Sequence, residues 1–98
     1  MRKKIKINVK AKVEIEKYPM VEVRWHDIVS NPNWISLDDL KSEKLAVCIT
    51  KGHLFSQANG ITRIFGDYAL NEKDTKKIEE VGNSTIIPNS NIIGMKKI

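Results

Sequence analysis

The sequence predicts a mainly β protein, a single domain of five or six short strands and one short helix that closes into a small barrel. Apolar and polar residues alternate along several short stretches, and Gly, Pro and Asn residues separate these stretches. The chain has 98 residues, which is enough for one modest core. Because an open sheet of short strands exposes two edges, closure into a barrel is the economical arrangement.

The first expected strand lies within residues 1–17, where apolar residues alternate with polar ones that are mostly lysines. It holds six basic residues without an acid before position 13: Arg2, Lys3, Lys4, Lys6, Lys10 and Lys12. The other 86 residues carry 11 basic and 12 acidic side chains, so the net charge of +5 is concentrated in this strand. We interpret its lysines as a solvated face that protects a sheet edge. Contact with RNA or DNA phosphates is the alternative.

The barrel itself is expected to comprise residues 20–98. After a turn at residues 18–19, a second alternating run at residues 21–26 predicts another strand. The stretch SNPNW predicts a loop, and Ser36 three residues before Asp39 is typical of a helix N-terminus. A short helix is therefore expected near residues 37–43.

The second half of the chain predicts a hairpin, a charged loop and a final strand pair. Residues 45–55 and 61–65 are rich in β-branched residues and flank the loop SQANG, with Gly52 at an expected bulge or turn. The charged segment 71–82 is expected to be a surface loop or a frayed helical turn. Pro88 lacks an amide hydrogen and so divides the last apolar stretch into two strands.

The sequence contains no catalytic or metal-binding pattern: no Gly-rich phosphate loop, metal-spaced Cys and His cluster, or G-x-S-x-G serine motif. His26 and Asp27 are neighbours on one strand and point to opposite faces, which disfavours an acid–base pair. His53 is expected at the surface, and Asp38 and Asp39 are expected to cap the helix. We therefore expect a binding protein that is not an enzyme and needs no metal or cofactor.

The chain is expected to reside in the cytoplasm. Cys48 is its single cysteine and lies in the apolar run LAVCIT, which is typical of a buried thiol and offers no intrachain disulfide. No apolar run approaches the roughly 20 residues that cross a bilayer, and no secretory leader is visible.

Two tryptophans, Trp25 and Trp34, flank the segment HDIVSNPN. Their rings would suit base stacking if both lined one pocket. In the alternative interpretation, Trp25 belongs to the core and Trp34 pins the loop onto the barrel. The sequence leaves both interpretations open.

A resemblance comes from an ordered set of short motifs over residues 20–98. These are WHDI, NWISLDDL, CITKGHLF, ITRIF and TIIPNSNIIGMKKI. The set resembles a group of short phage and prophage accessory proteins without an established activity. Thr50 and His53 depart from the outline, in which a serine and a large aromatic residue are usual.

The resemblance implies an SH3-like or Sm-like barrel in the host cytoplasm that acts by stoichiometric binding, often as a symmetric homo-oligomer. The first hypothesis is an anti-defence protein that sequesters a small nucleotide signal. Bases would stack on Trp25, Trp34 or Tyr68, phosphates would pair with Arg24 and Arg63, and Asp27 or Asn33 would hydrogen-bond base or ribose. The alternatives are a module that inhibits a host protein and a small barrel that binds RNA or DNA.

Overall fold

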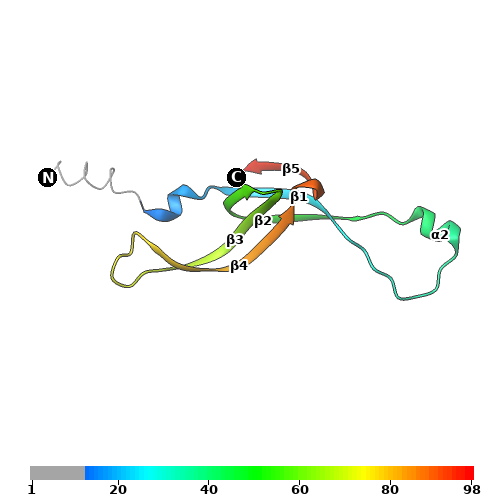
Figure 1. Ribbon diagram of the computed structural model, residues 1–98, viewed down its shortest axis with the longest axis horizontal. Coiled ribbons are helices and arrows are strands. Elements are labelled where there is room, and N and C mark those ends of the chain that lie inside the picture. Colours follow the sequence, from blue (N-terminus) through cyan, green and yellow to red (C-terminus); the bar gives the residue numbers. More distant parts are fainter. Residues whose placement is uncertain (1–12) are drawn as a thin grey trace.

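The computed structural model describes residues 13–98, in which five antiparallel strands form one sheet (Figure 1). The strands are β1 (Met20–Asp27), β2 (Ala46–Ala58), β3 (Ile61–Leu70), β4 (Ile78–Pro88) and β5 (Ile92–Lys97). Their order across the sheet is β4-β3-β2-β1-β5. The predicted mainly β class with one short helix is confirmed. The closed barrel is not confirmed, because β4 and β5 are the two edges of an open sheet.

A small core forms on one face of this sheet. Val21 and Val23 of β1 pack with Ile64 of β3 and Ile87 of β4, and all four side chains are at most 2% exposed. Strands β1 and β4 are not neighbours in the sheet, so these side chains meet only because the sheet is strongly coiled. Because the sheet coils, its own strands cover the core, as a second layer of helices or strands does in other folds.

Gly52 permits this coiling, because it lies in the middle of β2 and is buried where β3 passes close by. A Cβ atom at this position would lie 2.5 Å from Cγ2 of Ile64 and 2.8 Å from the carbonyl oxygen of Phe65. The prediction of a turn at Gly52 is wrong. The irregularity in pairing between β2 and β3 lies between Leu54 and Ser56 instead.

The predicted hairpin of β2 and β3 is confirmed. Asn59 and Gly60 connect the strands with φ angles of 57° and 79°, which suits a two-residue turn of type I′. The predicted break at Pro88 is also confirmed, because the 3₁₀ turn η2 (Asn89–Asn91) separates β4 from β5. The amide of Asn89 donates to the carbonyl oxygen of Gly60 at 2.9 Å, so the two turns hold each other.

The N-terminal strand is only partly open to comparison, because residues 1–12 and their six basic side chains lie outside the described residues. Where the prediction can be compared, it is wrong: η1 (Glu14–Lys17) is a 3₁₀ turn. Its backbone bonds to the loop between β3 and β4, and the Glu14 amide donates to the carbonyl oxygen of Lys76 at 2.7 Å. Residues 71–77 form this loop, whereas residues 78–82, also expected to be loop, belong to β4.

The predicted short helix is confirmed as α2 (Leu37–Ser42), and Oγ of Ser36 accepts a hydrogen bond from the Asp39 amide at 3.0 Å. This helix lies far from the sheet, at the end of the long connection between β1 and β2 (Figure 1). The molecule is correspondingly elongated. Its Cα radius of gyration is 19.7 Å, against about 13 Å for a compact chain of 100 residues.

Candidate functional site

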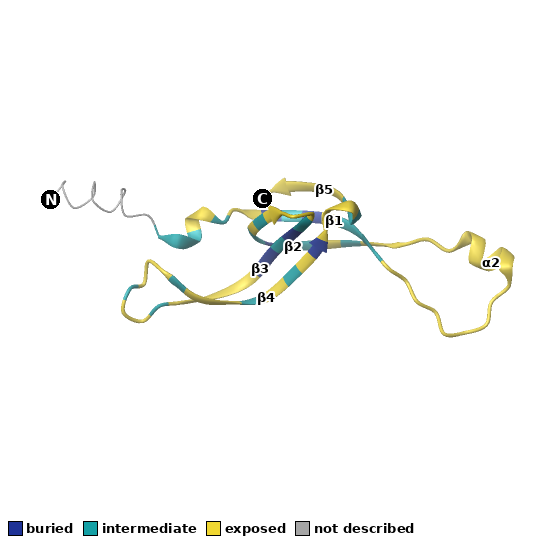
Figure 2. Cartoon of the chain, in the orientation of Figure 1, coloured by how far each residue is buried: buried dark blue, intermediate teal, exposed yellow. Residues whose placement is uncertain are grey.

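The connection between β1 and β2, residues 28–45, is the most unusual part of the molecule, and we call it the arm. It leaves the sheet at Asp27 and returns at Ala46, which are paired across the two strands. Every residue of the arm is exposed, as Figure 2 shows by its continuous yellow colour beyond the sheet. A connection of 18 residues is long for a compact domain, and long connections are often functional.

The arm is rich in large apolar side chains despite its exposure. Trp34 is 99% exposed and Leu37 is 85% exposed, so neither contacts the rest of the chain to any extent. Ile28, at the base of the arm, is 75% exposed. Covering a side chain of this size contributes about 1.5–3 kcal/mol. The arm therefore presents apolar surface that the chain itself does not use.

Short-range hydrogen bonds give the arm its local shape. Oδ1 of Asp27 accepts from the Ile28 amide at 2.8 Å, and Oδ1 of Asn31 accepts from the Asn33 amide at 3.0 Å. The Ser36 cap starts α2, whose six residues include none that is buried. A helix this short has little stability of its own in water. Packing against another surface would therefore stabilise the arm.

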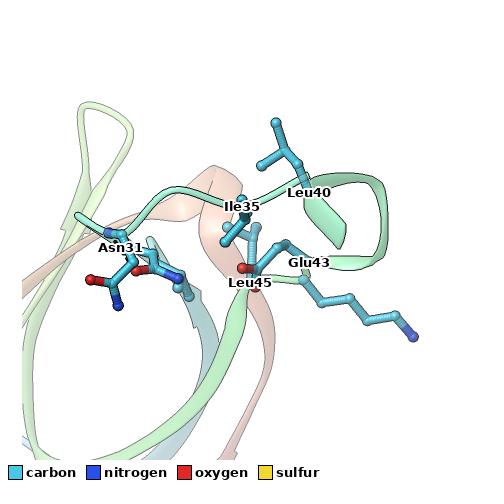
Figure 3. A pocket seen from close by; sticks show the side chains of 8 residues that line it. Asn31, Ile35, Leu40, Glu43 and Leu45 are labelled. Carbon is cyan, nitrogen blue, oxygen red and sulfur yellow. Dashed lines mark hydrogen bonds between the residues drawn. The ribbon is translucent and has the colours of Figure 1, made fainter. Parts of the chain in front are cut away.

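A hollow of about 410 Å³ lies within the arm (Figure 3). It is lined by Val29, Asn31, Asn33, Ile35, Leu40, Glu43, Lys44 and Leu45. All eight residues are exposed. In Figure 3, Leu40 points away from the other labelled side chains. The hollow is thus the open concave side of the arm and differs from the enclosed, mostly apolar sites that bury small ligands.

The structure separates the two tryptophans. Trp25 is half-buried against the core, and its Nε1 donates to Oγ1 of Thr50 at 2.9 Å. Trp34 lies in the arm and does not touch the sheet, so the interpretation in which it pins the loop onto a barrel is wrong. The loop between the tryptophans extends away from the sheet (Figure 1).

The other predicted ligand-binding residues lie in separate places. Arg24 is exposed on β1, whereas Asn33 lines the hollow of the arm. Arg63 donates from Nη1 to Oγ of Ser56 at 3.3 Å, on the β2–β3 hairpin. Tyr68 lies farther along β3, with its ring edge-on to His53 at 5.6 Å between centroids. One copy of the chain therefore does not gather these side chains into a single nucleotide pocket.

Two expectations about titratable side chains have different outcomes. His53 was expected at the surface but is half-buried, with Nδ1 3.0 Å from the carbonyl oxygen of Tyr18 and its ring stacked on Phe65. His53 is paired with Phe65 of β3, so its ring lies against that strand. Asp38 and Asp39 lie in the first turn of α2, as expected for capping residues.

An apolar patch that was not predicted lies on the outer face of the sheet, opposite the core. Val47 and Ile49 of β2 are 59% and 53% exposed, and Ile93 of β5 is 49% exposed. Arg24 lies between them, because its cross-strand partners are Ile49 on one side and Gly94 on the other. Residues directly opposite one another share a face of the sheet. We call these five residues the outer patch.

Alternation in the run LAVCIT was the available signal for this patch. Val47 and Ile49 take one face of β2, and Cys48 and Thr50 take the other. A strand that is apolar on both faces indicates two apolar surfaces. One packs on the small core, and the other needs a different surface to cover it. In the described part of the chain, Cys48 is half-buried and free.

Within residues 13–98, no three His, Cys, Asp or Glu side chains are close enough together to hold a metal ion. No helix in this range has the length and apolar character needed to cross a bilayer. Comparison of the chain with protein-family models, with curated proteins and with solved structures gives no match.

Proposed function

We propose that this chain is a non-enzymatic binding protein that acts by contact with another protein, and that the arm is its contact surface. The observation that supports the proposal is the complete exposure of an arm that carries Ile28, Trp34, Leu37 and Leu40. Several large apolar side chains exposed on one segment often indicate an interaction site. Tryptophan is also among the residues that contribute most to protein interfaces.

The total surface supports the same proposal. The accessible surface is 7985 Å², whereas a compact monomer of 11.2 kDa exposes about 5,700 Å². A larger surface than that of a compact monomer agrees with an exposed arm that leaves apolar side chains uncovered.

The hypothesis of nucleotide sequestration has less support, because the side chains proposed for it are spread over the arm, β1 and β3. A pocket for a nucleotide would have to be assembled between copies. Binding of RNA or DNA would depend on the basic residues before position 13. These residues lie outside the described part of the chain. The resemblance to phage accessory proteins agrees with stoichiometric binding and forms part of the proposal.

The finer fold assignment also belongs to this proposal. We infer an open form of the SH3-like barrel. Support comes from the 3₁₀ turn between β4 and β5, the return of β5 to pair with β1, and the packing of β1 against β3 and β4 across the coiled sheet. In such a fold, binding surfaces are often carried by the connections between strands.

The test is removal of the arm. Asp27 and Ala46 are already paired, so residues 28–45 can be replaced by Asn-Gly, which suits a tight β-turn. We expect the shortened chain to keep its β circular dichroism and to lose the complexes that the full chain forms on chemical cross-linking in an extract of the expressing cells. Retention of the same complexes by the shortened chain would contradict the proposal.

A thermal unfolding series separates this proposal from nucleotide binding. The full chain is heated with a panel of cyclic dinucleotides, ADP-ribose derivatives and short RNA, because a ligand that binds the folded state raises the midpoint. We expect no shift. A shift with one compound that persists in the shortened chain would assign the binding site to the sheet and overturn the role of the arm.

A further inference from the structure

We propose that the arm binds a second copy of this chain, with Trp34 of one copy seated on the outer patch of the other beside Arg24 and Gly94. This inference rests on the proposed function and names its partner. The starting point is that one chain carries two uncovered apolar surfaces, the arm and the outer patch, and that the arm extends away from its own sheet (Figure 1). Each surface lacks a cover within residues 13–98.

The outer patch has a place for an aromatic ring. A hollow of about 380 Å³ is lined by Glu22, Arg24, Ile93, Gly94, Met95 and Lys96. A Cβ atom at Gly94 would meet nothing within 4 Å, so the floor of the hollow lacks a side chain there. The space suits a single flat side chain, and Trp34, at 99% exposure, is the most exposed large apolar residue among those described.

Arg24 supplies a specific contact for an indole ring. Both ion pairs within residues 13–98 involve Glu22, which is 3.9 Å from Nζ of Lys51 and 3.5 Å from Nζ of Lys96, and neither includes Arg24. The guanidinium group is therefore not engaged by a described carboxylate. A planar guanidinium stacks on the face of a tryptophan, and this contact strengthens when water is excluded.

The charges on the two surfaces are complementary. Glu22, Arg24, Lys51 and Lys96 together give the hollow and its rim a net positive charge. Asp38 and Asp39 lie in the first turn of α2, four and five residues after Trp34. Seating Trp34 in the hollow would bring these carboxylates toward the basic rim. Complementary charge of this kind orients the approach of the two surfaces.

The small core also favours a second copy. Within residues 13–98 the core contains few buried apolar side chains: Val21, Val23, Ile64, Phe65 and Ile87. Another copy is the simplest cover for two exposed surfaces on one chain, and reciprocal exchange of two arms closes the assembly.

The experiment measures mass in solution for the full chain, for Trp34→Ala and for Gly94→Leu. Trp34→Ala removes the inserted ring, and Gly94→Leu places a side chain in the hollow, where its Cβ would meet no atom within 4 Å. We expect the full chain to have a mass of at least two copies by sedimentation velocity. Each variant should associate about 30-fold or more weakly, as for a central interface residue. Val81→Ala is the matched control, because Val81 is 49% exposed but lies on β4, and it should leave the mass unchanged.

Mixing the two variants tests the pairing directly. The Trp34→Ala chain keeps an open hollow, and the Gly94→Leu chain keeps its tryptophan, so one of two reciprocal contacts is restored in the mixture. We expect association intermediate between that of the full chain and that of either variant alone. This recovery would also show that both variants fold.

Three results would overturn the inference: a full chain that sediments as a monomer at high concentration, an assembly that survives Trp34→Ala, or a mixture that shows no recovery. A monomeric full chain that still forms arm-dependent cross-links with another protein would overturn the second copy as partner and leave the proposed function intact. A full chain that neither associates with itself nor forms arm-dependent cross-links would overturn the proposed function as well.

Discussion

Gly52 shows how a single residue determines the curvature of the sheet. Its missing side chain lets β2 approach β3 so closely that a Cβ atom would overlap Cγ2 of Ile64 and the carbonyl oxygen of Phe65. The Ile64 side chain can rotate away from an added Cβ atom, but the carbonyl oxygen of Phe65 is part of the backbone of β3, which is paired with β2 and cannot move as easily. Coiling at this point brings β1 over β3 and β4, and with it the core.

We expect Gly52→Ala to destabilise the chain by about 1–3 kcal/mol or more, because overpacking against backbone has no inexpensive relief. Urea denaturation followed by circular dichroism gives the free energy of unfolding. Gly82→Ala is the control, since its added Cβ would have only an ordinary contact of 3.7 Å with Cβ of Asp67. Equal stability of the two variants would contradict the close approach.

Neighbouring isoleucines on β4 give a second residue-scale prediction. Ile87 is fully buried and Ile86 is 59% exposed, so the two side chains occupy opposite faces. We expect Ile87→Ala to cost about 2–5 kcal/mol of unfolding free energy, which leaves a small chain largely unfolded. Ile86→Ala should change stability by about 0.5 kcal/mol or less. Similar losses in thermal unfolding would show that the core face is assigned wrongly.

At the scale of elements, the arm consists of local structure without tertiary support. The Ser36 cap and two Asx-type bonds define its turns, while no residue of α2 is buried. Its conformation therefore depends on capping and on whatever covers it. Such segments open readily and exchange their amide hydrogens quickly until they are bound.

We expect Ser36→Ala to weaken α2 by about 1 kcal/mol through loss of the bond to the Asp39 amide. Hydrogen exchange should quicken within residues 37–42 and stay unchanged in β2 and β3, because the helix packs on neither strand. Ser90→Ala is a matched exposed control away from the arm. Faster exchange throughout the sheet would show that the arm is coupled to the core.

Sequence reasoning succeeded where local rules determine structure. The alternation at residues 21–26, the helix cap at Ser36, the existence of the β2–β3 hairpin and the break at Pro88 all follow from short-range chemistry. The loop SQANG was predicted too long, because residues 56–58 belong to β2 and only Asn59 and Gly60 form the turn. It failed at Gly52 and His53, whose positions depend on how closely β3 approaches β2. It also failed for Trp34, because apolar character alone does not indicate whether a side chain packs inside its own chain or on another one.

At the scale of the whole molecule, the chain buries little and exposes much. A coiled open sheet supplies a small core, and the arm projects from the sheet with every residue exposed. A fold of this shape gains stability mainly when its apolar surfaces are covered. The predicted ligand pocket does not assemble in one copy, since its residues are fixed to distant elements.

We expect the midpoint of thermal unfolding to rise with protein concentration, because association stabilises only the folded state. Calorimetry over a hundredfold range of concentration checks this for the full chain. The chain in which Asn-Gly replaces residues 28–45 should unfold at a midpoint that is independent of concentration. A midpoint that is independent of concentration for both chains would contradict association through the arm.

The central claim is that the arm contacts another protein, and a photoreactive benzoylphenylalanine in place of Trp34 tests it most directly. Irradiation of this variant in the expressing cells should give a cross-linked product larger than one chain, and mass spectrometry would identify the attached protein. The same group in place of Val81 serves as the control and should give much less product. A label at position 34 that attaches only within its own chain, or no more often than the control, would contradict the claim.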